Sequence, residues 1–405
     1  MTDDLIPLDD ENWWQDPYPR LAEVRDRHRT GVTPDGQRVI LRWDDAEACK
    51  KSPAFENNGL EFIEERGFRP GDPLYEWRRY SIGALNGAEH HRLRSLVSRA
   101  MTVRSTDRMR ASARDHVERA LRGAASAGDV VEVDIREAFR SAPFFVITEF
   151  LGIEMASAIE MATTMGQGSA DAFGPNVTAE IRDAANHTFA VLMDFVGGLV
   201  EERRAEPRDD LLSALIDAEE AGDRLSHDEL VVLFTNIFGG AVESTLSAMT
   251  SVVYELARHP DQRELLADDT DAHKRGAVEE VLRHRPSFYA VGQRANAAVE
   301  LAGVSFAPAE NVSIVLGGPN RDPSRWDDPE RFDITRDPTV WSFTFSMGPH
   351  FCLGQALART ELQETAAAVA SLCRDLEVVE SPRWKPFSTV NQVEQLRVRY
   401  VLADG

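Results

Sequence analysis

Cysteine is scarce in this chain of 405 residues. Only Cys49, Cys352 and Cys373 occur, and no two of them form a C-x-x-C pair. The sequence therefore predicts neither a disulfide framework nor a structural zinc site.

Long apolar runs and positive charge are also scarce. The most apolar stretches, FFVITEFLGI and LVVLFTNIFGGAV, are short and contain Glu149 and Asn236, which argues against a membrane span. The acidic start, MTDDLIPLDDENWWQDPYP, lacks the features of a secretory signal, so we expect a cytoplasmic location. With 68 acidic and 45 basic residues, the formal net charge is -23, which disfavours nucleic acid or an anionic membrane as a partner.

Fixed-period repeats, low-complexity segments and Gly/Ser-rich linkers are missing too. We therefore expect one domain over residues 1–405. QRVILRW alternates as a short strand does, and DDAEACKK predicts a helix after it. From His90 to about Glu219 the pattern is largely helical.

A longer helix is predicted in the second half of the chain. It begins at Ser226, which forms a capping box with Glu229, and it ends before His259 and Pro260. Because it is apolar on most faces, it must cross the middle of the protein. The fold class is mainly α with small β-sheets.

The last third of the chain mixes strands, turns and one helix. VELAGVSF and NVSIVLG predict strands, and a final helix should run from about Leu353 to Leu376. The segment from Pro319 to Pro349 is too long for an ordinary connection, and its aromatic residues favour order.

Cys352 lies in the most informative stretch, FTFSMGPHFCLGQALART. Gly348, Pro349 and Gly354 surround it, and a helical pattern begins just after it. A thiolate at a helix N-terminus is stabilised by the helix dipole and by free N–H groups, which lowers the thiol pKa and suits a metal ligand. A bare cysteine would more often be a small core residue, so the assignment depends on this context.

The run F-S-M-G-P-H-F-C-L-G closely resembles the haem-binding signature of cytochromes P450, F-x-x-G-x-H-x-C-x-G. The resemblance implies the P450 fold, with haem b between a long central helix and the Cys-ligand loop. It implies that Cys352 is the proximal iron ligand, that Phe345 packs near the sulphur and that His350 faces a haem propionate. Gly348 and Gly354 fall on the signature, whereas Ser346 replaces a glycine that most bacterial members carry.

Further propionate partners follow from the same resemblance. GAEHHRLR matches the family's E-H-x-x-x-R helix and implies that His90 and Arg94 bind the propionates. Arg294, in VGQRA, resembles the family's other propionate arginine.

Glu280 and Arg283 are three residues apart on a predicted helix, so their side chains meet on one face. Most such pairs are exposed salt bridges that contribute little to stability. The resemblance implies instead a buried ion pair with a third member in DPERFDITR, where Arg331 is the first choice and Arg336 the second.

The segment NIFGGAVESTLSAM resembles the family's oxygen-activating pattern, Ala/Gly-Gly-x-Asp/Glu-Thr. Aligning Glu243 on the acid places Ala241, near the haem, on the glycine and Ser244 on the threonine, and both are departures. Thr245 is the weaker candidate for the relay because it points about 100° away. Gly239 and Gly240 could permit a kink in this helix.

The resemblance implies a haem monooxygenase that inserts one oxygen atom from O₂ into a small to medium, mainly apolar substrate by hydroxylation or O-/N-dealkylation. Electrons should come from NAD(P)H through a separate ferredoxin and ferredoxin reductase, since no Gly-rich dinucleotide fingerprint follows a predicted strand. A peroxide-driven peroxygenase and a non-enzymatic haem sensor are the alternatives. Position alone gives the candidates for the substrate pocket: Asn236, Ile237, Gly240, Phe288, Tyr289, Ala290, Val291 and Val390.

Overall fold

The computed structural model describes residues 3–98, 101–123, 125–165, 170–174, 176–208, 210–220, 225–268 and 270–403. More than half of it is helical, which confirms the predicted fold class. The α-helices are α1 Tyr18–Arg27, α2 Trp43–Lys51, α3 Glu61–Glu64, α4 Pro73–Tyr80, α5 Gly87–Ser98, α6 Val103–Asp107, α7 Arg110–Arg122, α8 Ile135–Phe139, α9 Ala142–Phe150, α10 Met155–Met165, α11 Ala179–Ala205, α12 Leu211–Glu220, α13 His227–Arg258, α14 Pro260–Glu264, α15 Asp271–His284 and α16 Gln355–Leu372. Part of the helical pattern expected between His90 and Glu219 lies outside the described residues.

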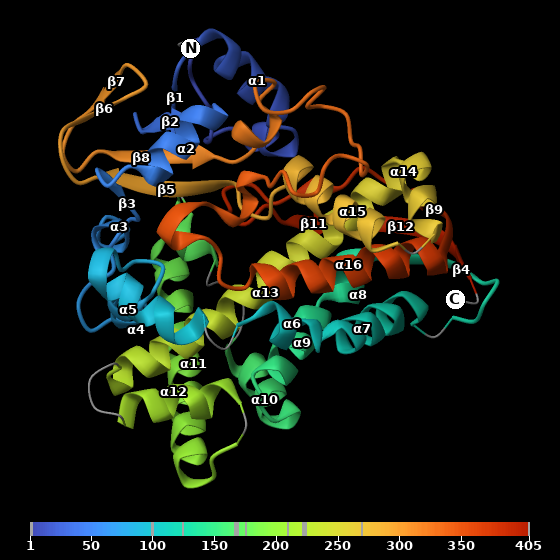
Figure 1. Ribbon diagram of the computed structural model, residues 1–405, viewed down its shortest axis with the longest axis horizontal. Helices are drawn as coiled ribbons and strands as arrows, with labels where there is room; N and C mark the ends of the chain where they lie inside the picture. The colour runs from blue at the N-terminus through green and yellow to red at the C-terminus, as the bar shows by residue number, and fades with distance from the viewer. Residues whose placement is uncertain are drawn as a thin grey trace.

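The strands form small sheets on two sides of the helices (Figure 1). The largest has the order β1-β2-β8-β5-β3, in which β2 and β8 are parallel and the other pairs antiparallel. The order β4-β12-β9 gives a second sheet, and β6-β7 and β10-β11 are two-stranded. The strands are β1 Gly31–Val32, β2 Arg38–Ile40, β3 Phe55–Glu56, β4 Val130–Asp134, β5 Ala290–Ala295, β6 Val299–Leu301, β7 Val304–Phe306, β8 Asn311–Val315, β9 Cys373–Val378, β10 Arg383–Trp384, β11 Val393–Gln395 and β12 Arg397–Leu402.

Helix α13 crosses the middle of the molecule, as its apolar sequence predicts (Figure 1). Ser226 is its N-cap: the Glu229 N–H donates to the Ser226 hydroxyl at 3.2 Å, and the Ser226 N–H donates to the Glu229 carboxylate at 2.8 Å. Leu230 to Phe238 pack with α5, α9, α10, α11 and α12, whereas Leu246 to Leu256 pack with α7, α15, α16 and the C-terminal sheet. The helix therefore joins two hydrophobic clusters.

By length and hydropathy, α13 could also span a membrane, although its apolar sequence run had looked too short for one. Its most apolar window is 56% buried inside the fold. A core helix meets the same criterion, so this observation is weak support for a membrane span.

Helix α16 is shorter than predicted. It ends at Leu372, and Cys373–Val378 forms β9, which pairs with β12. The predicted helix continued to Leu376 because local apolar spacing does not reveal that a distant strand, Arg397–Leu402, competes for these backbone groups.

The long segment from Pro319 to Pro349 is ordered, as its aromatic residues predict. Trp326, Phe332 and Phe343 are buried in it. The Arg283 guanidinium donates to the backbone carbonyls of Asn320, Pro329 and Arg331 at 3.0, 2.7 and 3.1 Å. One buried side chain on α15 therefore anchors three points of the segment.

Glu280 and Arg283 form the predicted buried pair, with Arg283 Nε 2.7 Å from the carboxylate and both side chains at most 2% exposed. The first choice of third member, Arg331, is wrong. Its side chain is 62% exposed, and only its backbone carbonyl reaches Arg283. Arg336 takes that place, with Nε 3.2 Å from Glu280 Oε1, because the turn after Arg331 brings it back over α15.

Candidate functional site

The loop before α16 bends tightly around Cys352. Its N–H donates to the Phe345 carbonyl at 3.0 Å, which closes the loop on itself. Gly348 has a φ of +69°, and an added Cβ would lie 2.9 Å from the Lys50 carbonyl of α2. This position therefore needs glycine both for its backbone angle and for the close approach of α2.

Cys352 is an exposed residue, although protein atoms pack densely around its thiol. Burial raises the pKa of this thiol, whereas the N–H groups of Gly354 and Gln355 and the charges of Arg359 and Arg94 lower it. The expected lowering by the helix N-terminus is therefore present but smaller than the effect of burial. A bound metal cation would supply the missing stabilisation of the thiolate.

The other two cysteines have different surroundings. Cys49 and Cys373 are buried in hydrophobic clusters, and burial raises the pKa of each thiol to about 12. Phe345, in the same loop, packs against the Arg359 guanidinium, whose carbon lies 4.4 Å from the ring centre.

Cationic and polar side chains gather beside the loop. The rings of His90, from α5, and His350, from the loop, lie 4.0 Å apart between centroids. Burial, with the charges of Arg94 and Lys50, lowers the pKa of His90 to about 4. Burial, the other histidine and the same two charges lower that of His350 to about 3. Asn86 Oδ1 lies 3.2 Å from His350 Nε2.

This cluster fits an anionic group. His90 Nδ1 is buried and has no hydrogen-bond partner among the described residues. Arg94, on the same face of α5, is close enough for its charge to act on His90, His350 and Cys352. Together with the accessible thiol, these groups could hold a haem, whose iron takes a thiolate and whose two carboxylates take cationic donors.

Arg294 lies in β5, apart from the histidine pair. Its Nη1 is buried without a hydrogen bond in the described part of the chain, and its nearest acids, Glu61 and Glu65, are 3.8 and 3.9 Å away. The Arg294 guanidinium could therefore also bind a carboxylate. No described contact joins it to His90 or His350.

Between its two exposed ends, α13 is also accessible in its middle. Gly239 and Gly240 are exposed, and Ala241 is half-buried against the cluster that also includes Leu353, the neighbour of Cys352. The helix is assigned without a break through both glycines.

The acid and hydroxyl groups of α13 are already engaged. Arg136 of α8 donates to the Glu243 carboxylate at 2.7 Å. The Ser244 hydroxyl donates to the Gly240 carbonyl one turn earlier, also at 2.7 Å. Thr245 is 4% exposed and lies in the core. The sequence carries no signal for Arg136, because it approaches from a helix more than a hundred residues away.

The pocket candidates divide into two groups. Phe288 is 39% exposed and bridges to Val390, and Ile237 and Gly240 are accessible on α13. The Asn236 amide, in contrast, accepts from the Ser81 hydroxyl at 2.7 Å and donates to the Val232 carbonyl at 2.6 Å, so it is not a free polar anchor.

Tyr289 packs against aromatic side chains of the N-terminal segment. Its ring lies 5.2 and 4.9 Å from the rings of Trp13 and Trp14, in the N-terminal hydrophobic cluster. Ala290 packs against the same cluster, and Val291 packs against the cluster under the main sheet. Successive residues of β5 point to opposite faces of the sheet, so Ala290 and Val291 pack against different clusters.

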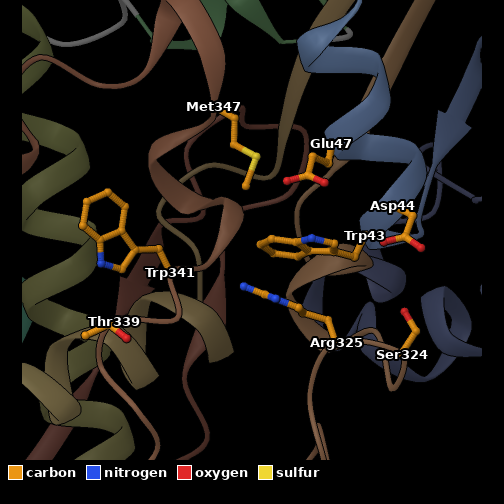
Figure 2. Close-up of a pocket in the computed structure, with 8 residues that line it drawn as sticks. All are labelled: Trp43, Asp44, Glu47, Ser324, Arg325, Thr339, Trp341 and Met347. Atoms are coloured by element: carbon orange, nitrogen blue, oxygen red, sulfur yellow. The ribbon is translucent and has the colours of Figure 1, made fainter.

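A surface pocket of about 390 Å³ is lined by residues of α2 and of the segment from Ser324 to Met347 (Figure 2). None of its lining residues comes from α13. Trp341, in its wall, stacks on Phe351 with ring centroids 5.7 Å apart. The lining residues are Trp43, Asp44, Glu47, Ser324, Arg325, Thr339, Trp341 and Met347.

Known proteins resemble the chain over most of its length. The family model for Cytochrome P450 matches residues 61–371. Cytochrome P450 107B1 of Saccharopolyspora erythraea is 33% identical over 416 residues, covering 98% of each chain. The 6-deoxyerythronolide B hydroxylase of the same organism is 33% identical over 374 residues, covering 87% of this chain and 88% of the relative. The crystal structure of CalO2 aligns with a TM-score of 0.87 and 27% identity, covering 96% of this chain and 97% of that one.

These matches agree with the three features described above, which are the exposed cysteine, the cationic cluster beside it and the long helix that crosses the molecule. Haem b with a cysteine ligand is the cofactor of the family, and oxygen insertion is its reaction. The chain belongs to the cytochrome P450 family and is a haem monooxygenase.

Proposed function

We propose that Cys352 supplies the thiolate ligand of haem b, within one catalytic domain that spans residues 1–405. The observation that carries this assignment is the contrast among the three cysteines. Cys352 alone is an exposed residue, and it lies where the N–H groups of Gly354 and Gln355 stabilise a thiolate. Cys49 and Cys373 are buried among apolar side chains.

Carbon monoxide binding tests the ligand. The reduced protein should give the carbon monoxide band from which the family takes its name. Cys352→Ala should abolish this band, whereas Cys49→Ala and Cys373→Ala should keep it. A band that survives in Cys352→Ala, or that is absent from folded, haem-loaded native protein, would overturn the assignment.

The remaining residues bind and orient the cofactor. His90, Arg94, Arg294 and His350 hold the propionates, and Phe345, Gly348 and Gly354 shape the loop around the sulphur. Ala241 and Gly240 let α13 approach the cofactor closely. Bound haem supplies the activation of O₂, and the protein contributes the thiolate, the pocket and the supply of protons.

Glu243 and Ser244 move protons toward the distal side of the site, and Thr245 remains a packing residue. For this step the Ser244 hydroxyl must leave the Gly240 carbonyl, and Glu243 must exchange its contact with Arg136 for water. A relay needs an acid, a hydroxyl and water within hydrogen-bond reach.

The substrate is small to medium in size and mainly apolar, and hydroxylation is the favoured reaction. Ile237 and Phe288 keep accessible apolar surface, and Val390 is buried next to Phe288. Titration with a panel of apolar compounds tests the assignment, because a substrate that displaces iron-bound water changes the Soret band.

Electrons come from NAD(P)H through a separate ferredoxin and ferredoxin reductase in the cytoplasm. The proposal rests on the lack of a dinucleotide fingerprint in the sequence. Product formation from NAD(P)H by this chain alone would refute it.

Peroxide-driven oxygenation is the second candidate. The engagement of Ser244 with Gly240 and of Glu243 with Arg136 favours it, because neither proton-relay group is free. Efficient turnover with hydrogen peroxide alone would support this alternative.

A further inference from the structure

Lys50 is a buried lysine at the end of α2. It is 6% exposed, whereas the side chain of its neighbour Lys51 is 65% exposed and pairs with Glu47 at 2.9 Å. Successive helix residues differ in direction by about 100°, so Lys51 faces solvent while Lys50 points into the protein.

No acid balances this buried charge. The Lys50 ammonium donates to Asn57 Oδ1 at 3.2 Å, and no ion pair joins it to a carboxylate within the described ranges. Burial lowers its pKa to about 8. An ammonium has three donors and is stable in a protein interior only when an anion or several acceptors face it.

The surroundings of Lys50 point to an anion. Its charge acts on His90 and His350, so it belongs to the same cationic cluster. Asn57, which accepts its hydrogen bond, is joined to the cluster, because the Asn57 N–H donates to Asn86 Oδ1 at 3.0 Å and the same atom lies 3.2 Å from His350 Nε2.

Helix α2 also touches the Cys loop directly. The Lys50 carbonyl lies 2.9 Å from the point that a Cβ on Gly348 would occupy. Lys50 therefore approaches the cluster from a third element, α2, in addition to α5 and the loop. A buried ammonium, a histidine nitrogen without a partner and an arginine converge there without a described carboxylate.

We propose that Lys50 binds a haem propionate, together with His90 and Arg94. The inference rests on the proposed function, because it requires haem at Cys352, and it adds a ligand outside every motif that the sequence analysis used. A carboxylate supplies the charge that Lys50 lacks and accepts its remaining hydrogen bonds.

The proposal predicts opposite effects on two properties, the stability of the haem-free protein and the retention of haem. A lysine that only supported the fold would affect both in the same direction. In Lys50→Met the haem-free protein should be at least as stable as the native one, because a buried charge without a counter-charge is removed. The same variant should lose haem faster, because the propionate loses a charged partner. A lysine that only supports the fold would instead lower the stability of the haem-free protein.

The experiment measures transfer of haem to excess apomyoglobin from the native protein, Lys50→Met and the matched control Lys51→Met. Each protein is loaded either with haem b or with its dimethyl ester, in which the propionate charges are removed. Lys50→Met should release haem b roughly tenfold faster than the native protein does, the effect of one charge-assisted hydrogen bond. It should release the dimethyl ester at the native rate, and Lys51→Met should match the native protein with both.

Three outcomes would overturn the proposal: unchanged release of haem b, equal acceleration for both forms of haem, or the same effect in Lys51→Met. Should Lys50→Met fail to fold, Lys50→Arg serves as the second variant. It keeps the charge, and release of haem b near the native rate is expected; release as fast as that of the dimethyl ester would contradict the proposal. Loss of the carbon monoxide band in the native protein would instead reject the haem–Cys352 assignment itself.

Discussion

Ser346 has a backbone conformation that glycine adopts with less strain. Its φ is +60° and its ψ is -165°, in a region that is nearly exclusive to glycine, and its buried hydroxyl has no partner among the described residues. The family resemblance already marked this residue as a departure from glycine. In the structure, serine at this position strains the backbone of the loop that holds Cys352.

Ser346→Gly should raise the free energy of unfolding by about 1 kcal/mol. This value is the relief of about 1–3 kcal/mol of backbone strain less the entropy that glycine loses on folding. Denaturant unfolding of the haem-free protein measures it. Ser342→Gly is the control, because Ser342 caps the preceding turn at an ordinary φ of -80° and should not gain stability. Equal effects at both positions would contradict the strain argument.

Ser244 is the residue where the family pattern and this sequence differ most directly in chemistry. Ser244→Ala should keep substrate binding but divert electrons to peroxide, lowering product per NAD(P)H by about tenfold or more, since it removes a proton-transfer group. Ser244→Thr should couple at least as well as the native enzyme. Thr245→Ser is the control, because Thr245 is buried. Native coupling in Ser244→Ala would remove Ser244 from the mechanism.

At the scale of elements, α15 is linked to the Pro319–Pro349 segment by three arginines whose expected contributions to stability differ. Arg283→Ala should destabilise the protein by roughly 3–5 kcal/mol, because it leaves Glu280 charged and buried. Arg336→Ala should cost about 1–2 kcal/mol, because Arg336 is at the edge of the pair. Arg331→Ala should change the free energy of unfolding by less than about 0.5 kcal/mol.

Unfolding curves and haem content of the three variants test this order. An effect of Arg331→Ala as large as that of Arg336→Ala would contradict the position of Arg336 in the pair.

A second buried group joins α13 to α15. His284 Nδ1 lies 3.1 Å from the Glu255 carboxylate and Arg285 Nε lies 2.5 Å from it. Burial alone would raise the pKa of Glu255. Hydrogen bonds and charge from His284 and Arg285 outweigh it and hold this pKa well below its usual 4.5. Because the folded pKa is depressed, the stabilisation is present above pH 4.5 and is lost as the pH falls toward the folded value.

Glu255→Gln should therefore lower the free energy of unfolding at neutral pH, and the difference from the native protein should shrink as the pH falls below 4.5. Denaturant titrations at neutral and acid pH measure this difference. A difference that does not depend on pH would show that Glu255 acts through packing alone.

For the whole molecule, the net charge of -23 affects the choice of electron donor. Ferredoxins are commonly acidic, so a basic patch near the Cys352 side is needed to offset long-range repulsion. With such a donor, turnover should weaken as salt rises toward about 0.5 M, where the Debye length falls to a few ångströms. Peroxide-driven turnover is the control and should not change in the same way. Donor-dependent turnover that is insensitive to salt would contradict electrostatic docking.

The sequence by itself determined the features that depend on neighbouring residues. The capping box of Ser226 and Glu229, the strand and helix around Trp43, and the Glu280–Arg283 pair each involve residues a few positions apart. Their geometry follows from the period of a helix or a strand and from local hydrogen bonds. The Cys loop belongs with them, because its glycines and its helix start are local.

Only the tertiary structure decided which distant groups meet. It exchanged Arg331 for Arg336, ended α16 at Leu372, directed Tyr289 to Trp13 and Trp14, and brought Arg136 to Glu243. It also placed Lys50 beside His90 and His350, although the helices and loop that carry them are far apart in the chain. Spacing along a sequence sets which face of an element a side chain occupies, whereas its partners are set by how whole elements pack, and that depends on the shape and volume of many side chains at once.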